Sequence, residues 1–316
     1  MAADTGTAGS GSEVQVPSAA AALGMALAVA SAAGFSMKAI FVKLAYVYGV
    51  DAETLLALRM AYSLPVFLAI GLFALWRGGY RLTRRDWLAL LVLGFLGYYL
   101  ASYLDFLGLN YISASLERLI LFSYPTLVVL ISVVYFGKAL SRGMLVSLVV
   151  CYAGVGLAVG HDLMLAPGRA AVLTGAALVF GSALSYSLYI VGNAQVVHRI
   201  GAQHLTGWAS SFACLISLGQ FFAMRPVSAL VQPWQVHAYA FGMAMLSTVL
   251  PVWCLSQAIR LIGAGKVALT ANLGPVLTMG FAWLLLGEHL GAYQIGGAML
   301  VIGGVLMVAR ENVRRA

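Results

Sequence analysis

Ile112–Leu140 reads ISASLERLILFSYPTLVVLISVVYFGKAL, an apolar stretch long enough to cross a lipid bilayer. It nevertheless carries Glu117 and Arg118 near one end and Pro125 in its middle. A charge in the hydrocarbon costs about 2.5 to 3.5 kcal/mol on insertion scales, and an internal proline leaves a backbone carbonyl without its helical donor. These residues therefore indicate a helix whose polar side faces a protein-lined or water-filled interior.

The same layout returns from Ala264 as AGKVALTANLGPVLTMGFAWLLLGEHL. The spacing is ungapped, since Pro275 less Pro125 is 150 and Gly287 less Gly137 is also 150. Further pairs in this register are Leu100/Leu250, Ala114/Ala264, Leu119/Leu269, Leu127/Leu277, Leu140/Leu290, Gly154/Gly304 and Val155/Val305. Matches at Leu or Ala arise easily by chance in apolar sequences, but a coincident proline and a coincident helix-end glycine indicate an internal duplication.

The composition is that of a membrane protein. Hydrophobic residues make up 62% of the chain and charged residues 9%, with a mean hydropathy of +0.95, whereas soluble domains carry about 25% charged residues. The net charge of +8 would suggest a nucleic-acid partner in a soluble protein, but here the excess lies in short loops, where Lys and Arg set membrane orientation. We therefore expect contact with membrane lipids and no nucleic acid.

Binding motifs for cofactors and metals are missing from the sequence. It contains no GxxxxGK[ST] loop for ATP, and its five histidines form no ligand cluster. The three cysteines all lie inside apolar runs, which predicts neither a disulfide framework nor a metal site. We expect no cofactor and no metal.

Ten apolar runs of helical length follow a short polar tail. Residues 1–18, rich in Ala, Gly, Ser and Thr, are expected to be disordered. Membrane helices are predicted near 21–44, 54–76, 87–109, 113–136, 143–160, 171–192, 204–223, 237–260, 266–286 and 291–309. We assign 19–160 to a first repeat of five helices, 171–310 to a second, and 311–316 to a basic tail. The short connections predict that sequential helices pack as antiparallel neighbours.

Positive charge is divided unevenly between the two sets of loops. If the N-terminus is cytoplasmic, the outer loops hold only Arg169 and Arg225. The inner segments then hold Arg77, Arg81, Arg84, Arg85, Lys138, Arg142, Arg199, Arg260, Lys266, Arg310, Arg314 and Arg315. Because cytoplasmic loops are enriched in Lys and Arg, this bias predicts that both termini are cytoplasmic.

Five helices per repeat is an odd number, so the second repeat begins on the opposite side of the membrane from the first. The fold predicted is therefore an all-α membrane protein of ten transmembrane helices in two inverted five-helix repeats. Transporters that work by alternating access build a central site between such halves.

This layout resembles the drug/metabolite transporter superfamily, and most closely proteins with two EamA-type repeats. The resemblance rests on the ungapped repeats, the ten short-looped helices, and the proline followed by Gly-Lys-Ala-Leu at 137–140 or Gly-Glu-His-Leu at 287–290. It covers nearly all of residues 20–310. It implies a multi-pass carrier of the bacterial inner membrane that moves small metabolites, commonly outward. It implies no particular substrate, and Glu117 and Arg118 depart from the small, apolar helix start that is usual in this family.

Ionisable residues inside the predicted helices gather in the first repeat. Lys38 lies in the outer part of the first helix. The hairpin that turns near Tyr111 sets Asp105, six residues before it, level with Glu117, six residues after it, so that either acid can reach Arg118. Two interpretations stay open. The charges pair and fix helix packing, or they line a cavity in which Arg118 binds a carboxylate while an acid balances the charge or binds an ammonium.

Other residues complete the predicted binding site. Pro125 and Pro275 lie at similar depth and are predicted to bend their helices or act as hinges. Aromatic and hydrogen-bonding side chains on the surrounding helices would form the walls. They are Tyr124, Tyr186, Trp253, Gln257 and Asn272. Each of these five residues, taken singly, also fits ordinary packing.

Together these features predict a secondary transporter, specifically an exporter, of a small polar metabolite such as an amino acid. Proton or solute coupling stays open, and so does the choice between a monomer and a homodimer, for which Gly156 and Gly160 form one GxxxG motif. A membrane-embedded enzyme is the first alternative, and it would need a clustered acid, base or metal set that the sequence lacks. A non-transporting structural or sensory subunit is the second, and it predicts fully paired charges around Arg118.

Overall fold

The computed structural model describes residues 18–78, 80–137, 141–165 and 168–315, and within them all regular structure is helical. The predicted disordered tail lies outside these residues except for its last member. The elements are α1 (Ser18–Tyr46), α2 (Ala52–Trp76), α3 (Arg84–Gly94), η1 (Phe95–Leu100), α4 (Ala101–Gly108), α5 (Ala114–Leu121), α6 (Tyr124–Phe136), α7 (Arg142–Leu165), α8 (Arg169–Ile200), α9 (Ala202–His204), η2 (Leu205–Ala209), α10 (Ser210–Met224), η3 (Val227–Leu230), α11 (Trp234–Ala244), η4 (Met245–Val249), α12 (Leu250–Ile262), α13 (Ala264–Ala271), α14 (Gly274–Leu286) and α15 (Ala292–Arg315).

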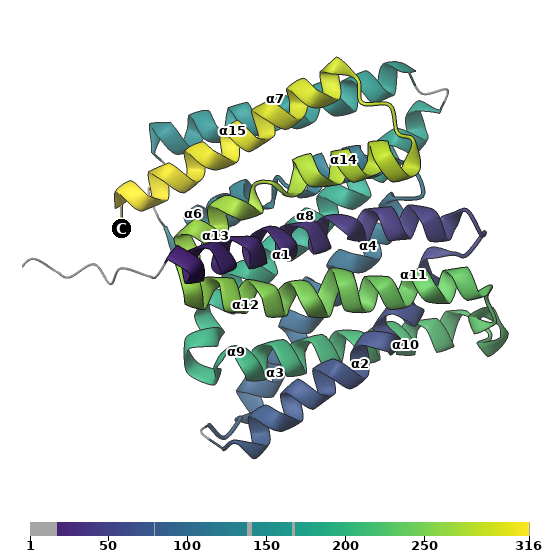
Figure 1. Ribbon diagram of the computed structural model, residues 1–316, viewed down its shortest axis with the longest axis vertical. Coiled ribbons are helices and arrows are strands. Elements are labelled where there is room, and N and C mark those ends of the chain that lie inside the picture. The colour runs from purple at the N-terminus through teal and green to yellow at the C-terminus, as the bar shows by residue number, and fades with distance from the viewer. Residues whose placement is uncertain (1–17, 79, 138–140, 166–167, 316) are drawn as a thin grey trace, which may run out of the picture.

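These elements make ten crossings of an apolar layer. Across the described ranges, 9 continuous helical spans are long and apolar enough to cross a membrane, and the shorter apolar helix α14 completes a tenth crossing with α13. The predicted all-α membrane fold is confirmed. We call the side on which α1 begins and α15 ends the terminal face, at the left of Figure 1, and the other side the opposite face.

The duplication extends to individual helix boundaries. Helices α3 and α11 begin 150 residues apart, at 84 and 234, and end 150 residues apart, at 94 and 244. The same offset relates α5 to α13 and α6 to α14 at both ends. Even the π-helical turns η1 and η4 begin 150 residues apart, at 95 and 245. The two repeats therefore have the same internal structure and run in opposite directions through the layer.

The most extensive packing joins helices from different repeats. Helix α1 packs on α12 and α14, and the symmetry-related helix α8 packs on α4 and α6. The pairs α2 with α10 and α7 with α15 lie near the axis that relates the repeats. Figure 1 shows α1 beside α12 in the centre and α7 beside α15 at the edge. Helices that follow each other in the chain contact each other less, because each repeat buries its apolar faces against the other.

Local sequence signals fix several helix ends. Thr83 and Asp86 form a reciprocal capping box at the start of α3, and the Ser113 hydroxyl caps α5 by accepting from the Leu116 amide at 3.1 Å. Gly137 and Gly287 end α6 and α14 in the left-handed region, at φ of 63° and 67°. Because that conformation disfavours side chains with a Cβ, the two glycines terminate both crossings in the same way.

Gly154 on α7 allows close contact with α15, and this contact yields a stability prediction. A Cβ at Gly154 would lie 2.7 Å from the Gly297 carbonyl oxygen and 2.9 Å from the Val301 nitrogen, whereas a Cβ at Gly156 meets nothing within 4 Å. We expect Gly154→Ala to lower the free energy of unfolding by about 1 to 3 kcal/mol through overpacking. Gly156→Ala, two residues away on the same helix, should be neutral or slightly stabilising. Thermal unfolding of the purified variants in detergent measures both, and equal melting temperatures would contradict this packing.

Candidate functional site

The crossings that contain Pro125 and Pro275 are interrupted at the same position. The first breaks between α5 and α6 and the second between α13 and α14, with Pro125 and Pro275 in the first turn of each second segment. A proline has no N–H, so the carbonyl four residues earlier loses its helical donor. The first break is buried at Phe122 and Ser123, whereas the second is partly open, with Leu273 exposed. The predicted hinge role of the two prolines stays a prediction.

Each break is held by a serine of the other repeat. The Ser187 hydroxyl on α8 donates to the Tyr124 carbonyl at 3.1 Å, and the Ser36 hydroxyl on α1 donates to the Gly274 carbonyl at 3.1 Å. Tyr124 and Gly274 are the first residues of α6 and α14 and are themselves 150 residues apart. These hydrogen bonds tie the two interruptions to the interface between the repeats, where we place the candidate site.

Lys38, Asp105 and Glu117 form an ion cluster beside the first break. The Lys38 Nζ lies 2.6 Å from Asp105 Oδ2 and 3.6 Å from Glu117 Oε1, and both acids are fully buried. They come from α1, α4 and α5. Burying charge is costly unless it is paired, so one ammonium shared by two carboxylates links three helices tightly. The hairpin geometry inferred from the sequence brought the two acids level, and the structure joins them through Lys38.

Arg59 of α2 adds a second buried cation. It is 7% exposed, and its guanidinium donates to the hydroxyls of Ser102 at 3.3 Å and Thr248 at 3.1 Å. Its Cζ also lies 5.6 Å from the centre of the Phe106 ring. Thr248 belongs to η4, and π-helical turns of this kind are frequent at functional sites. The sequence marks Arg59 as an intramembrane charge but gives no signal for the π-helical turn.

Arg118 points away from the ion cluster. Glu117 and Arg118 are consecutive on α5, so their side chains leave the helix about 100° apart. A Cβ on Gly274 would lie 2.7 Å from Arg118 Nη2, which places the guanidinium against the start of α14. Among the described residues it has no carboxylate within ion-pair distance and no hydrogen-bond acceptor, and its Nε is buried. The expected pairing of Arg118 with Asp105 or Glu117 is therefore not formed, because Lys38 takes both acids.

A row of tyrosines borders Arg118. The rings of Tyr124 and Tyr186 meet edge to face with centroids 5.2 Å apart, and Tyr186 stacks on Tyr189 at 5.7 Å. Both Tyr124 and Tyr186 are within electrostatic reach of Arg118. The hydroxyl of Tyr189 is hydrogen-bonded to that of Tyr98 at 3.0 Å. The hydroxyls of Tyr124 and Tyr186, in contrast, have no hydrogen-bond partner in the part of the chain that the structure describes.

The remaining predicted site residues lie on the second repeat. Asn272 lies in the break between α13 and α14 and is partly exposed, two residues from Gly274. On α12, Trp253 is 55% exposed and the Gln257 amide oxygen accepts from Arg260 at 3.3 Å. Asn272 thus lies in the same break as Gly274, which contacts Arg118, whereas Trp253 and Gln257 share a face of α12. Their role in binding stays a prediction.

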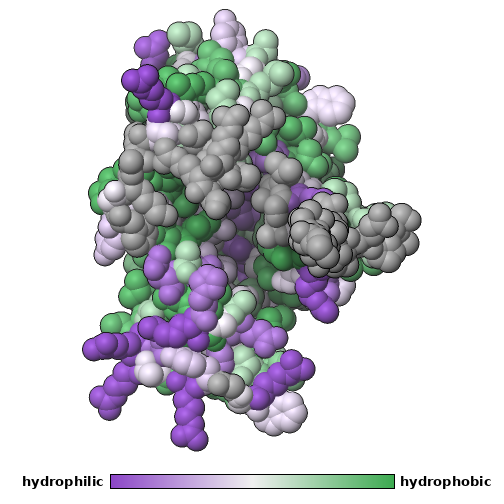
Figure 2. Space-filling model, turned by 90° about the vertical axis from the view of Figure 1, so that its left-hand side faces the viewer, coloured by the Kyte–Doolittle hydropathy of each residue, from purple (hydrophilic) through white to green (hydrophobic). Residues whose placement is uncertain are grey.

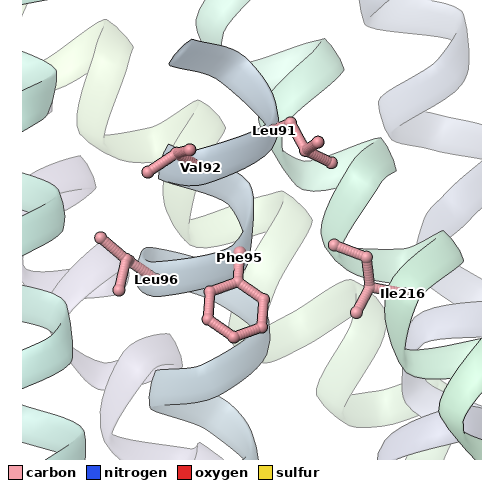
Figure 3. A pocket seen from close by; sticks show the side chains of 5 residues that line it. All are labelled: Leu91, Val92, Phe95, Leu96 and Ile216. Carbon is pink, nitrogen blue, oxygen red and sulfur yellow. The ribbon is translucent and has the colours of Figure 1, made fainter. Parts of the chain in front are cut away.

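An apolar groove elsewhere on the bundle is a separate feature. It has a volume of about 500 Å³ and is lined by Leu91, Val92, Phe95 and Leu96 with Ile216 of α10. Figure 3 shows that all these side chains are hydrocarbon and come from two neighbouring crossings. Because the groove offers no polar group, it suits a lipid chain better than a polar solute, and we do not include it in the site.

Polar contacts join the two repeats on the opposite face. The Glu288 carboxylate, just after α14, accepts from the Ala114 amide at 2.7 Å, the Ser115 amide at 3.1 Å and the Ser115 hydroxyl at 2.7 Å. It thereby caps the start of α5, where a negative charge also interacts favourably with the helix dipole. Nothing in the sequence pointed to this contact, because the two segments are 174 positions apart.

A model of the EamA-like transporter family matches residues 22–160 and again residues 173–310. The chain belongs to the EamA-like transporter family. Each match corresponds to one five-helix repeat. The duplication and the family resemblance read from the sequence are therefore confirmed, and the EamA assignment identifies the chain as a multi-pass membrane transporter.

Two bacterial transporters and a solved structure resemble the chain along most of its length. The uncharacterized transporter YcbK of Bacillus subtilis (strain 168) is 31% identical over 293 residues, covering 86% of this chain and 88% of YcbK. The uncharacterized inner membrane transporter YicL of Salmonella typhimurium is 25% identical, covering 74% of this chain and 77% of YicL. One crystal structure has a TM-score of 0.59 at 19% identity and covers 94% of this chain and 99% of its own, which shows a shared fold.

Proposed function

We propose that this EamA-like protein is a secondary exporter of a small polar metabolite that works by alternating access. One observation carries the proposal. Two matching helix breaks from inverted repeats flank Arg118, which lies one turn before the first break and places its guanidinium against Gly274 at the second, with no partner among the described residues. An unpaired cation at this depth is costly, and such residues mark substrate pathways. If the chain were a structural or sensory subunit, we would expect the charges here to be paired. Membership of a transporter family also argues against a membrane-embedded enzyme.

We propose the cytoplasm as the location of the terminal face. Figure 2 shows that face, where hydrophilic side chains gather over the ends of α2 and α3 and hydrophilic surface is also visible between helices near the centre. Exposed arginines on these segments include Arg77, Arg81, Arg84 and Arg85. The positive-inside rule then puts both termini in the cytoplasm of a bacterial cell, with the opposite face outward.

Glu288 provides a candidate gate for alternating access. Its three hydrogen bonds to α5 hold the two repeats together on the opposite face. The residue 150 positions earlier, at the corresponding end of α6, is Lys138, which lies outside the described residues. A lysine only donates hydrogen bonds, so it cannot cap α13 as Glu288 caps α5. The sequence thus supports such a carboxylate contact on one face only, and we call the contact of Glu288 with α5 the latch. The two repeats can separate toward the opposite face only when the hydrogen bonds of the latch break.

Exchange by the purified protein tests the proposed function. The protein is reconstituted in liposomes loaded with one unlabelled solute from a panel of amino acids, nucleosides and organic acids, and uptake of the same labelled solute is followed. We expect at least one solute to accumulate transiently above the level in protein-free liposomes. No accumulation with any member, in vesicles containing correctly folded protein, would contradict transport of this substrate class.

A further inference from the structure

We propose that the transported solute is an organic monocarboxylate with an apolar body, bound through its carboxylate by Arg118, Tyr124 and Tyr186. This inference rests on the proposed function and names the chemistry of its substrate. It is carried by three hydrogen-bond donors near the first helix break that have no partner among the described residues.

The guanidinium of Arg118 is the main anchor. It presents up to five N–H donors in a planar fork, which matches the two oxygens of a carboxylate. No described residue accepts from it, and it is partly exposed, so a ligand can reach it. It also lies against the first residue of α14. The start of a helix carries partial positive charge, so the cation and the helix end together favour an anion between them.

Tyr124 and Tyr186 supply two further donors. Their rings pack edge to face 5.2 Å apart, and both tyrosines are within electrostatic reach of Arg118. Neither side chain is fully exposed or fully buried. Neither hydroxyl is used by another described residue, in contrast with the hydrogen-bonded hydroxyls of Tyr98 and Tyr189. A carboxylate oxygen accepts from such hydroxyls, whereas an ammonium group would compete as a donor.

The charge balance favours an anion over a zwitterion. Arg59 on α2 is a buried cation and Lys38, Lys43 and Arg118 are half-buried ones, whereas the acids Asp105 on α4 and Glu117 on α5 are fully buried. Lys38 contacts both acids, so neither carboxylate is free to bind the ammonium of an amino acid. Arg118 is then left without a carboxylate among the described residues, and the carboxylate of a bound ligand would neutralise it.

Two features of the surrounding wall define the rest of the ligand. Tyr186 stacks on Tyr189, which gives the site ring surface for an apolar or aromatic body. Because Gly274 has no Cβ, the guanidinium can lie directly against the start of α14, since a Cβ there would lie 2.7 Å from Arg118 Nη2. The wall therefore fits a compact organic acid better than a sugar or nucleoside, which would need several hydrogen-bond partners.

Binding of three probes with the same ring separates the ligand classes. Benzoate carries the carboxylate, benzamide replaces it by a neutral amide, and phenylalanine adds an ammonium. We expect benzoate to raise the melting temperature of the full-length protein in detergent, with little shift for benzamide or phenylalanine. An equal shift with benzamide, a shift with phenylalanine but not with benzoate, or no shift with benzoate would overturn the carboxylate assignment.

Substitutions then locate the site. Arg118→Gln should weaken benzoate binding about 10-fold or more, and Arg118→Lys should weaken it less because the charge remains. Arg169→Gln, at an exposed arginine that begins α8, is the matched control and should bind benzoate as the parent does. If Arg118→Gln does not fold, Tyr124→Phe tests the same site by removing one hydroxyl. Unchanged benzoate affinity in every folded site variant would overturn the assignment.

The outcome also distinguishes this inference from the proposed function. If liposomes exchange an amino acid or nucleoside while benzoate fails to bind, transport stands and the carboxylate class is wrong. If benzoate binds through Arg118 but no solute in the panel is exchanged, the anion site stands and the transporter proposal fails.

Discussion

Lys38→Met is expected to lower the free energy of unfolding by about 3 to 5 kcal/mol. The substitution keeps most of the side-chain volume but removes the only cation in ion-pair contact with Asp105 and Glu117 among the described residues. Both acids are fully buried, so each would lose its compensating charge without gaining water. Thermal unfolding in detergent measures this loss of stability, and we expect a large fall in melting temperature.

Two further variants test whether the lost charge balance causes the lower stability of Lys38→Met. Lys43→Met removes a lysine five residues along the same helix that has no carboxylate within ion-pair distance in the described structure, and its effect should be small. The triple variant Lys38→Met, Asp105→Asn, Glu117→Gln removes all three charges together and should recover at least half of the lost stability. If the triple variant is less stable than Lys38→Met, the cluster is not held together by ion pairing.

Glu288→Gln is expected to open the opposite face. The amide keeps one acceptor oxygen but loses the negative charge and the second oxygen that together receive the two backbone amides and the Ser115 hydroxyl of α5. Hydrogen bonds to a charged group contribute roughly 1.5 to 3 kcal/mol each. A loss of about 1.4 kcal/mol already changes a population ratio about 10-fold. The population of molecules that are open toward the opposite face should therefore grow about 10-fold or more.

Distances between spin labels report this opening. Labels at Asn110 and His289, exposed residues in the loops after α4 and α14, span the opposite face beside the latch. The parent protein should show mainly the short distance, and Glu288→Gln should add a longer one. Asp162→Asn is the matched control, since Asp162 joins the repeats on the same face through one hydrogen bond from Gln294 of α15 at 3.2 Å, which the oxygen of an asparagine still accepts. Identical distance distributions for the two acid-to-amide variants would argue against the latch.

The sequence predicted the fold well because the evidence for it is periodic and repeated. Pro125 and Pro275, with Gly137 and Gly287, mark the same breaks and ends in both repeats, and the structure shows helix boundaries at the same offset. The number of crossings follows from the apolar runs alone. The choice of packing partners does not follow from these runs, because contacts between the two repeats are set by the shapes of the helix faces and not by loop length.

The site was predicted less completely, because spacing along a hairpin fixes depth but not side-chain direction. Asp105 and Glu117 come level as expected, yet Lys38 from another helix reaches them first and leaves Arg118 to face α14. The capping contact of Glu288 on α5 lies across the repeat boundary and has no local sequence signal. Trp253 is aromatic and lies within a crossing, but the sequence cannot show that its ring is half exposed.

Access to the central site from the two faces is the most direct test of alternating access between the repeats. The buried cysteines Cys151, Cys214 and Cys254 are first replaced by alanine. Asn272→Cys then places a single thiol in the second break. A membrane-impermeant thiol reagent is then applied to right-side-out and to inside-out vesicles. We predict labelling from both sides, each reduced by the transported solute. Labelling from one side only, whatever the solute, would contradict a site that opens to each face in turn.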